Sequence, residues 1–191
     1  DIYNVLFIRL LENLNDENYN KIFSNSIDIE SKNMAMPTQT TWLLNIDRSL
    51  SMAIDLTGLS LNQVRSMRWI DVGCGNGISS LYAAIRFGIK NQYLFDLDPK
   101  CVKESFVNYN RAKSSVFNLK KYIIQPKIEV SDAYKDIIDF DDKIKNVIYM
   151  YNPFDNIVME EFISKNINLI SNGCIIIYIN DKHNHSIKKN L

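Results

Sequence analysis

The stretch Met67–Gly77, MRWIDVGCGNG, decides the fold of this chain. It begins as a short apolar run and ends in three glycines at alternating positions, a pattern typical of a buried strand that runs into a tight turn. Residues 79–87 follow with the spacing of a helix, and Gly88 is a typical helix end. A strand, a glycine turn and a helix in this order predict the start of a βαβ unit.

The same alternation continues along the chain. Short apolar runs predict further strands at QYLFD (92–96), KIEV (127–130), NVIYMY (146–151) and CIIIYI (174–179). Helical spacing predicts helices over 2–14, 38–56, 61–66, 99–112 and 157–170. Strands separated by helices of this length form parallel βαβ units whose sheet is covered on both faces. The predicted fold class is therefore α/β, a doubly wound and mostly parallel sheet.

Length and hydrophobic content are those of a chain with one substantial core. The chain has 191 residues, of which 46% are hydrophobic. We expect an α/β domain over residues 61–191, preceded by a helical extension over residues 1–60. No run of about 20 apolar residues predicts a membrane span.

Charge and cysteine content disfavour several classes of function. Lys and Arg (22) balance Asp and Glu (22), and a zero net charge disfavours generic binding to nucleic acid or to acidic membranes. Cys74, Cys101 and Cys174 are scattered, which argues against a disulfide framework or a zinc site and fits a reducing cytoplasm. His183 and His185 have no carboxylate or cysteine cluster beside them, so we predict a solvated tail there and no metal site.

Chemistry-bearing residues gather where the predicted strands end, which is where α/β sheets bind ligands. Gly73, Gly75 and Gly77 let the backbone turn tightly and let a ligand approach closely. Ile78 stands where the dinucleotide fingerprint needs glycine, and the P-loop lysine is missing too. Asp96, at the end of the second strand, stands at the sequence distance from which a carboxylate reaches a ribose.

The turn DVGCGNG closely resembles motif I of the class I S-adenosylmethionine-dependent methyltransferases, and the resemblance runs from about residue 68 to 179. It implies a Rossmann-like methyltransferase core, with S-adenosylmethionine as cofactor and S-adenosylhomocysteine as product. In that family the glycine turn lies against the methionine and ribose of the cofactor, and the acidic residue upstream, here Asp71, helps to hold its amino-acid end. Asp96 matches the ribose-binding residue of motif II, and Asp132 in VSDAY matches an Asp that accepts from the adenine amino group. The cofactor-binding residues implied are Asp71, Gly73, Cys74, Gly75, Gly77, Asp96, Leu97, Asp132, Ala133 and Asn152.

These residues also have simpler structural interpretations. A glycine-rich turn between a strand and a helix can be a tight turn with no ligand. Asp132 can cap a helix, and Asp98, which precedes Pro99, is typical of an N-cap. The order of the three motifs, each at the end of a strand, favours the cofactor interpretation.

The fourth strand ends in YMYNPFD, which resembles the NPPY or DPPF motif of methyltransferases that act on planar amino groups, with one proline missing. The resemblance implies catalytic roles for Asn152, as hydrogen-bond acceptor from the target amine, and for Phe154, as stacking platform. The alternative is a helix-entry turn in which Asn152 caps, Pro153 stiffens and Phe154 packs. In an O-methyltransferase, Asp155 or Tyr151 could instead serve as the base.

The resemblance implies a methyltransferase, and the zero net charge favours a small-molecule acceptor over nucleic acid; a protein acceptor stays open. The alternatives are a nucleic-acid or protein N-methyltransferase, a catalytically silent scaffold member of the fold, and an aminopropyl-transfer relative. The family's sheet usually has seven strands, whereas five are predicted here. A truncated chain, or an oligomer, a partner or a rearranged terminus that covers the sheet edge, would account for the difference. Thr38, Gln39 and Thr40 are candidate pocket residues, because helices before motif I often cover the cofactor in this family.

Overall fold

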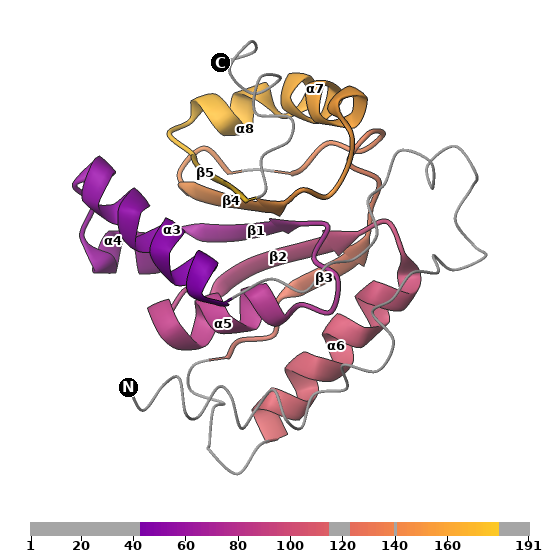
Figure 1. The fold of residues 1–191 in the computed structure, drawn as a ribbon, viewed down its shortest axis with the longest axis horizontal. Coiled ribbons are helices and arrows are strands. Elements are labelled where there is room, and N and C mark those ends of the chain that lie inside the picture. Colours follow the sequence, from indigo (N-terminus) through magenta and orange to yellow (C-terminus); the bar gives the residue numbers. More distant parts are fainter. Residues whose placement is uncertain (1–42, 115–122, 140, 180–191) are drawn as a thin grey trace.

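The computed structural model describes residues 43–114, 123–139 and 141–179 (Figure 1). The helix predicted over 2–14, the candidate pocket residues 38–40, and the tail with His183 and His185 lie outside these ranges.

Five parallel strands form one sheet in the order β3-β2-β1-β4-β5 (Figure 1). The strands are β1 (Arg68–Val72), β2 (Asn91–Asp96), β3 (Lys127–Val130), β4 (Asn146–Tyr151) and β5 (Ile175–Ile179). All five lie where the sequence predicts them, within one or two residues. Val72 pairs with Phe95 on one side and with Met150 on the other, so β1, β2 and β4 end at the same edge. The chain builds outward from β1 first to one side and then to the other, and such a switch in strand order places the ligand crevice at the carboxyl end of the central strands.

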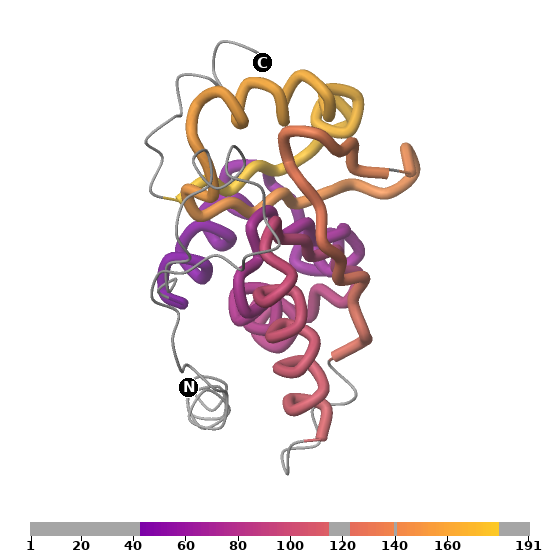
Figure 2. The backbone as a smooth tube through the Cα atoms, turned by 90° about the vertical axis from the view of Figure 1, so that its right-hand side faces the viewer, coloured from indigo at the N-terminus to yellow at the C-terminus, as the bar shows by residue number. Residues whose placement is uncertain are grey.

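Helices cover both faces of the sheet, as a doubly wound fold requires (Figures 1 and 2). One layer contains α3 (Leu43–Thr57), α4 (Leu61–Ser66), α5 (Ile78–Phe87) and α6 (Pro99–Ser114). The opposite layer contains α7 (Asn156–Lys165) and α8 (Ile167–Ser171).

The single helix predicted over 157–170 is wrong, because Asn166 divides it into α7 and α8. The Asn166 side chain accepts a hydrogen bond from the Ile138 backbone N–H at 2.9 Å and donates one to the Phe162 carbonyl at 2.8 Å. It therefore joins the loop after β3 to the end of α7.

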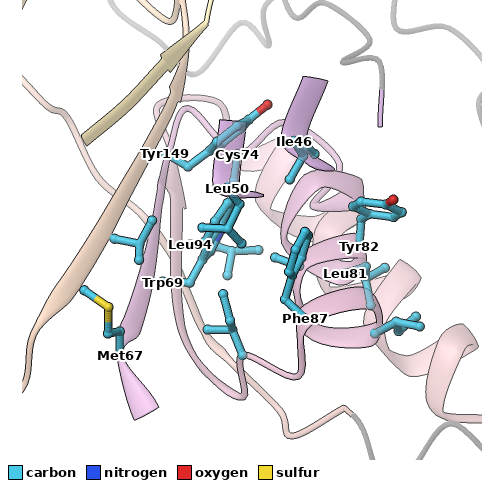
Figure 3. Packing of buried hydrophobic residues seen from close by; sticks show 14 of the residues in the cluster. Ile46, Leu50, Met67, Trp69, Cys74, Leu81, Tyr82, Phe87, Leu94 and Tyr149 are labelled. Carbon is cyan, nitrogen blue, oxygen red and sulfur yellow. The ribbon is translucent and has the colours of Figure 1, made fainter. Parts of the chain in front are cut away.

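Alternate residues of β1 enter different cores, because successive side chains of a strand point to opposite faces. Trp69 faces the α5 layer, where its indole stacks on Tyr149 with ring centroids 5.1 Å apart (Figure 3). Ile70 and Val72 face the α7 layer. Asp71, which alternates with Ile70 and Val72, therefore lies on the α5 side of the sheet, and this decides its surroundings.

Helix α3 packs on α5 and β5, with Ile46 and Leu50 completely buried (Figure 3). Arg86 of α5 forms an ion pair with Asp47 of α3 at 2.9 Å. The helix that the sequence assigns to the N-terminal extension thus contributes to the core of the α/β unit, and a domain boundary at residue 60 stays a prediction. No helix in the described ranges is both long and apolar enough to cross a membrane.

Candidate functional site

The glycine turn between β1 and α5 lies between the ends of β2 and β4. Gly73, Gly75 and Gly77 all have positive φ angles, of 73°, 53° and 76°. The backbone N–H groups of Gly73 and Cys74 both donate to the Phe95 carbonyl at 3.0 Å, which ties the turn to β2. A Cβ on Gly73 would lie 2.7 Å from the Cβ of Pro153, so the turn also contacts the segment after β4. Only glycine fits this position, by conformation and by space.

Asp96 is the carboxylate that contacts this turn. Its Oδ2 accepts a hydrogen bond from the Gly75 N–H at 2.9 Å, and its Oδ1 accepts one from the Asp98 N–H at 2.9 Å. Burial raises the pKa of Asp96 to about 6, although these backbone N–H groups act to lower it. The carboxylate is therefore largely ionised at neutral pH, and no cation in the described part of the chain forms an ion pair with it. Each oxygen retains a lone pair that a ligand hydroxyl can occupy.

Asp98 has the capping role that the sequence suggests. It is buried, and its Oδ1 accepts a hydrogen bond from the Lys100 N–H at 2.8 Å, at the start of α6. Leu97, between the two aspartates, is half-buried and contributes a backbone hydrogen bond that lowers the pKa of Asp96.

Asp71 lies in the α5 layer and is only 2% exposed. Its Oδ2 accepts a hydrogen bond from Ser80 Oγ at 2.5 Å, and Ser80 Oγ in turn accepts from Trp69 Nε1 at 3.0 Å. Burial, and to a smaller extent the nearby charge of Asp96, raises the pKa of Asp71 to about 7. Asp71 and Asp96 are thus close enough for their charges to interact, and together they give the turn a negative potential.

Asn152 combines a strained backbone with an unsatisfied side chain. Its φ of 42° lies in the left-handed region, where non-glycine residues are uncommon. The residue is 2% exposed; its Oδ1 accepts from the Tyr178 hydroxyl at 3.4 Å, and its Nδ2 has no partner among the described residues. A buried donor without an acceptor costs about 1–3 kcal/mol. Strain and an unpaired polar atom at one residue are typical of a binding site.

The residues after Asn152 follow the helix-entry interpretation in part. Asp155, and not Asn152, caps α7: its Oδ1 accepts from the N–H groups of Ile157 and Val158, both at 3.0 Å. Phe154 is 5% exposed, and its ring packs on Phe162 of α7 with centroids 6.0 Å apart. As placed, the Phe154 ring belongs to the core under α7, and a stacking role for it stays a prediction.

The Asp132 side chain contacts other residues of the loop after β3. Asp132 Oδ1 accepts from the Tyr134 N–H at 2.9 Å, and its Oδ2 lies 3.2 Å from Lys135 Nζ. Ala133 packs against the cluster under α7. Asp132 thus closes a turn at residues 133–135 and does not cap a helix, because no helix lies between β3 and β4 in the described residues. Its role in binding adenine stays a prediction.

Cys74 and Gly77 complete the predicted set. Cys74 is buried, and burial raises the pKa of its thiol well above the usual range, so the side chain is a neutral part of the core. Gly77 begins α5, and a Cβ there would lie 2.9 Å from Ser105 Oγ.

The structure thus joins the glycine turn to Asp96 and to the segment after β4. Sequence reasoning missed Ser80, which holds Asp71, and Tyr178, which contacts Asn152. It also missed Ser105 and a second α6 residue, Asn108, which both contact the turn. Buried polar residues on a predicted core face of a helix were the available signal for Ser105 and Asn108.

Comparisons with known proteins bear on the fold. No protein-family model matches the sequence, and no curated protein matches it. Thermoplasma acidophilum protein 1320 has a similar structure, with a TM-score of 0.50 and 16% identity over 100% of this chain and 76% of that one. An S-adenosylmethionine-dependent methyltransferase from Clostridium acetobutylicum gives a TM-score of 0.45 and 16% identity over 72% of this chain and 50% of that one. A third similar structure is geranyl diphosphate C-methyltransferase from Streptomyces coelicolor, solved with Mg²⁺, geranyl diphosphate and S-adenosylhomocysteine. Its TM-score is 0.42, with 14% identity over 96% of this chain and 78% of that one.

At these identities the likeness concerns the fold alone. The parallel sheet in the order β3-β2-β1-β4-β5, with helices on both faces, is a doubly wound, Rossmann-like α/β fold. The predicted fold class is confirmed.

Proposed function

We propose that the protein is an S-adenosylmethionine-dependent methyltransferase that acts on a small molecule. The observation that carries the proposal is the contact between Asp96 and the glycine turn. One carboxylate, held by the N–H groups of Gly75 and Asp98, presents two oxygens beside a turn in which Gly73 has no space for a Cβ. Such a site suits a ligand with two neighbouring hydroxyls that lies directly against the backbone.

The charge of the site fits this cofactor. Asp71 and Asp96 are both acidic, and the mutual repulsion of their charges helps to raise the pKa of Asp71. A ligand with a sulfonium and an ammonium group relieves that repulsion, because its positive charges favour the ionised carboxylates. Asp96 would hold the ribose, and Asp71 would act on the amino-acid end from behind the turn. Asp132 and Ala133 would lie near the adenine.

When bound, S-adenosylmethionine supplies an electrophilic methyl group on its sulfur. The chain must then align an acceptor and hold or remove its proton. Asn152 is suited to alignment, because its amide is buried, its backbone is strained, and its Nδ2, a donor, has no partner in the described ranges. The acceptor role that the motif implies would fall to Oδ1, which also accepts from the Tyr178 hydroxyl at 3.4 Å. Pro153, the next residue, lies against the glycine turn, so this amide would lie near a cofactor bound at the turn. The zero net charge of the chain favours a small-molecule acceptor over nucleic acid.

A second candidate is a cofactor-binding member of the fold that transfers no methyl group. The observation that favours it is the Phe154 ring, which packs on Phe162 instead of forming an open platform. Retained cofactor binding with no S-adenosylhomocysteine released across pools of small-molecule acceptors would support this candidate. The scattered positions of Cys74, Cys101 and Cys174, without a CxxC pair, support a reducing cytoplasm as the place of action.

Calorimetric titration with S-adenosylmethionine and S-adenosylhomocysteine tests the proposal. We expect micromolar binding of both, weakened at least about tenfold, or roughly 1.4 kcal/mol, by Asp96→Ala. Asp141→Ala is the matched control, since it removes the same charge from an exposed carboxylate that accepts from the Lys143 N–H in its own turn. Absence of binding by the folded wild-type protein, or equal weakening by both substitutions, would contradict the proposal.

A further inference from the structure

Helix α6 has polar residues on the face that it buries. Ser105 is completely buried and Asn108 is 2% exposed, one helical turn apart. They lie on the same side of the helix as Cys101 and Ala112, which are also buried. Buried polar side chains reduce stability unless they are hydrogen-bonded, so their partners indicate why this face tolerates them.

Both side chains donate to backbone carbonyls of the glycine turn. Ser105 Oγ donates to the Gly75 carbonyl at 2.8 Å, and Asn108 Nδ2 donates to the Asn76 carbonyl at 3.0 Å. The helix lies so close to the turn that a Cβ on Gly77 would be 2.9 Å from Ser105 Oγ. Two successive carbonyls of the turn are thus held by one face of α6.

These two bonds fix the orientation of two peptide planes. In a trans peptide the C=O and the N–H point in opposite directions, and no described peptide is cis. A Gly75 carbonyl directed at α6 therefore directs the N–H of Asn76 away from α6. A turn with three glycines has a large conformational freedom to lose when a ligand orders it, and that loss lowers affinity.

The same helix also holds the carboxylate of the site. The Asp98 N–H, directly before α6, donates to Asp96 Oδ1, and the Asp98 side chain caps the helix. Asp96 in turn accepts from the Gly75 N–H. Helix α6 is therefore joined to both ligand-binding parts, and its position sets their separation.

We propose that Ser105 and Asn108 are positioning residues that hold the glycine turn in its ligand-binding conformation before the ligand arrives. The identity of the ligand rests on the proposed function, whereas the anchoring of the turn does not. Ser105→Ala and Asn108→Ala each remove one anchor. Ser105→Ala deletes a single oxygen atom and keeps a good helix former, so it is the variant that best preserves the fold.

Asn166→Ala is the matched control. Asn166 is also 2% exposed, and its amide also hydrogen-bonds backbone groups, but in the opposite layer, at Ile138 and Phe162. It should cost stability without affecting the turn. The two readouts are the Kd for S-adenosylhomocysteine and the hydrogen-exchange rates of the amides of residues 74–78 in the ligand-free protein.

We expect Ser105→Ala and Asn108→Ala each to raise the Kd by about fivefold or more and to speed amide exchange in the turn by about tenfold, since each removes one buried hydrogen bond. Asn166→Ala should lower the unfolding midpoint and leave amide exchange in the turn unchanged. Its Kd is not part of the comparison, because Asn166 holds the loop after β3, where Asp132 and Ala133 would lie near the adenine. Unchanged Kd and exchange in both α6 variants, or the same acceleration of exchange in Asn166→Ala, would overturn the inference. If the wild-type protein does not bind S-adenosylhomocysteine, the proposed function fails, and the exchange rates alone decide whether Ser105 and Asn108 anchor the turn.

Discussion

Replacement of Gly73 by alanine separates the two reasons for glycine in the turn. Gly73 has a φ of 73°, and a Cβ added there would lie 2.7 Å from the Cβ of Pro153. Gly58, just after α3, has a similar φ of 65° but no atom within 4 Å of its added Cβ. Gly58→Ala therefore measures the backbone cost alone, whereas Gly73→Ala measures the backbone cost together with the overlap.

The left-handed conformation costs an alanine about 1–2 kcal/mol, so we expect Gly58→Ala to lower the free energy of unfolding by that amount. Overlap in a packed site adds about 1–3 kcal/mol, because the neighbour is the stiff ring of Pro153 and part of a strained segment. Gly73→Ala should therefore cost about 2–5 kcal/mol. It should also displace Pro153 and the adjoining Asn152, and so weaken S-adenosylhomocysteine binding.

Urea unfolding followed by circular dichroism measures both variants, with equal m-values as the condition for comparing them. Calorimetric titration with S-adenosylhomocysteine at pH 7, without urea, then gives the Kd of each folded variant. Equal losses of stability in Gly58→Ala and Gly73→Ala, with ligand binding unchanged in both, would refute the argument that the turn is closed against Pro153.

Three further predictions concern the aspartates. The pKa of Asp71 is raised from 3.8 to about 7 in the folded state, so its contribution to stability is complete below about pH 4 and is lost as the pH rises towards 7. The unfolding free energy of the wild type should therefore fall over this pH range, and Asp71→Asn should reduce that fall by up to about 1 kcal/mol per pH unit. The same slope in the variant and the wild type would count against a buried carboxyl at this position. The pKa of Asp96 is about 6, and its ionised form is the better acceptor, so the affinity for S-adenosylhomocysteine should rise from pH 5 to 7.5 in the wild type. The rise should be smaller in Asp96→Asn, where only Asp71 still titrates in this range, and equal rises in the two proteins would count against Asp96 as the acceptor. Asp155→Ala removes the cap of α7 and should lower the unfolding free energy by about 1 kcal/mol with no change in ligand Kd; a large loss of affinity at full stability would assign Asp155 to the site instead.

The strands could be predicted because each is a short apolar run with a clear boundary. NVIYMY becomes β4 residue for residue, and the glycines after Val72 end β1 where the pattern indicates. The break between α7 and α8 could not be predicted from periodicity. It depends on the Asn166 side chain, whose partner Ile138 lies 28 residues away in the sequence.

The sequence indicated which residues belong to the candidate site better than it indicated their contacts and burial. Asp96 lies beside the glycine turn as the ribose argument requires, because β1 and β2 end at the same level. The burial of Asp71 depends on which face of β1 it occupies and on Ser80, nine residues along the chain. The motif YMYNPFD does not show that the Phe154 ring packs on Phe162 of α7, since that contact depends on how α7 lies against the sheet.

A crystal structure of the protein with S-adenosylhomocysteine tests the central claim most directly. We predict that both ribose hydroxyls donate to Asp96 at hydrogen-bond distances of about 2.5–3.0 Å, with the Gly75 N–H still bound to Oδ2 and the ligand lying against Gly73. Binding at another place on the molecule, or a ribose that does not touch Asp96, would contradict the account.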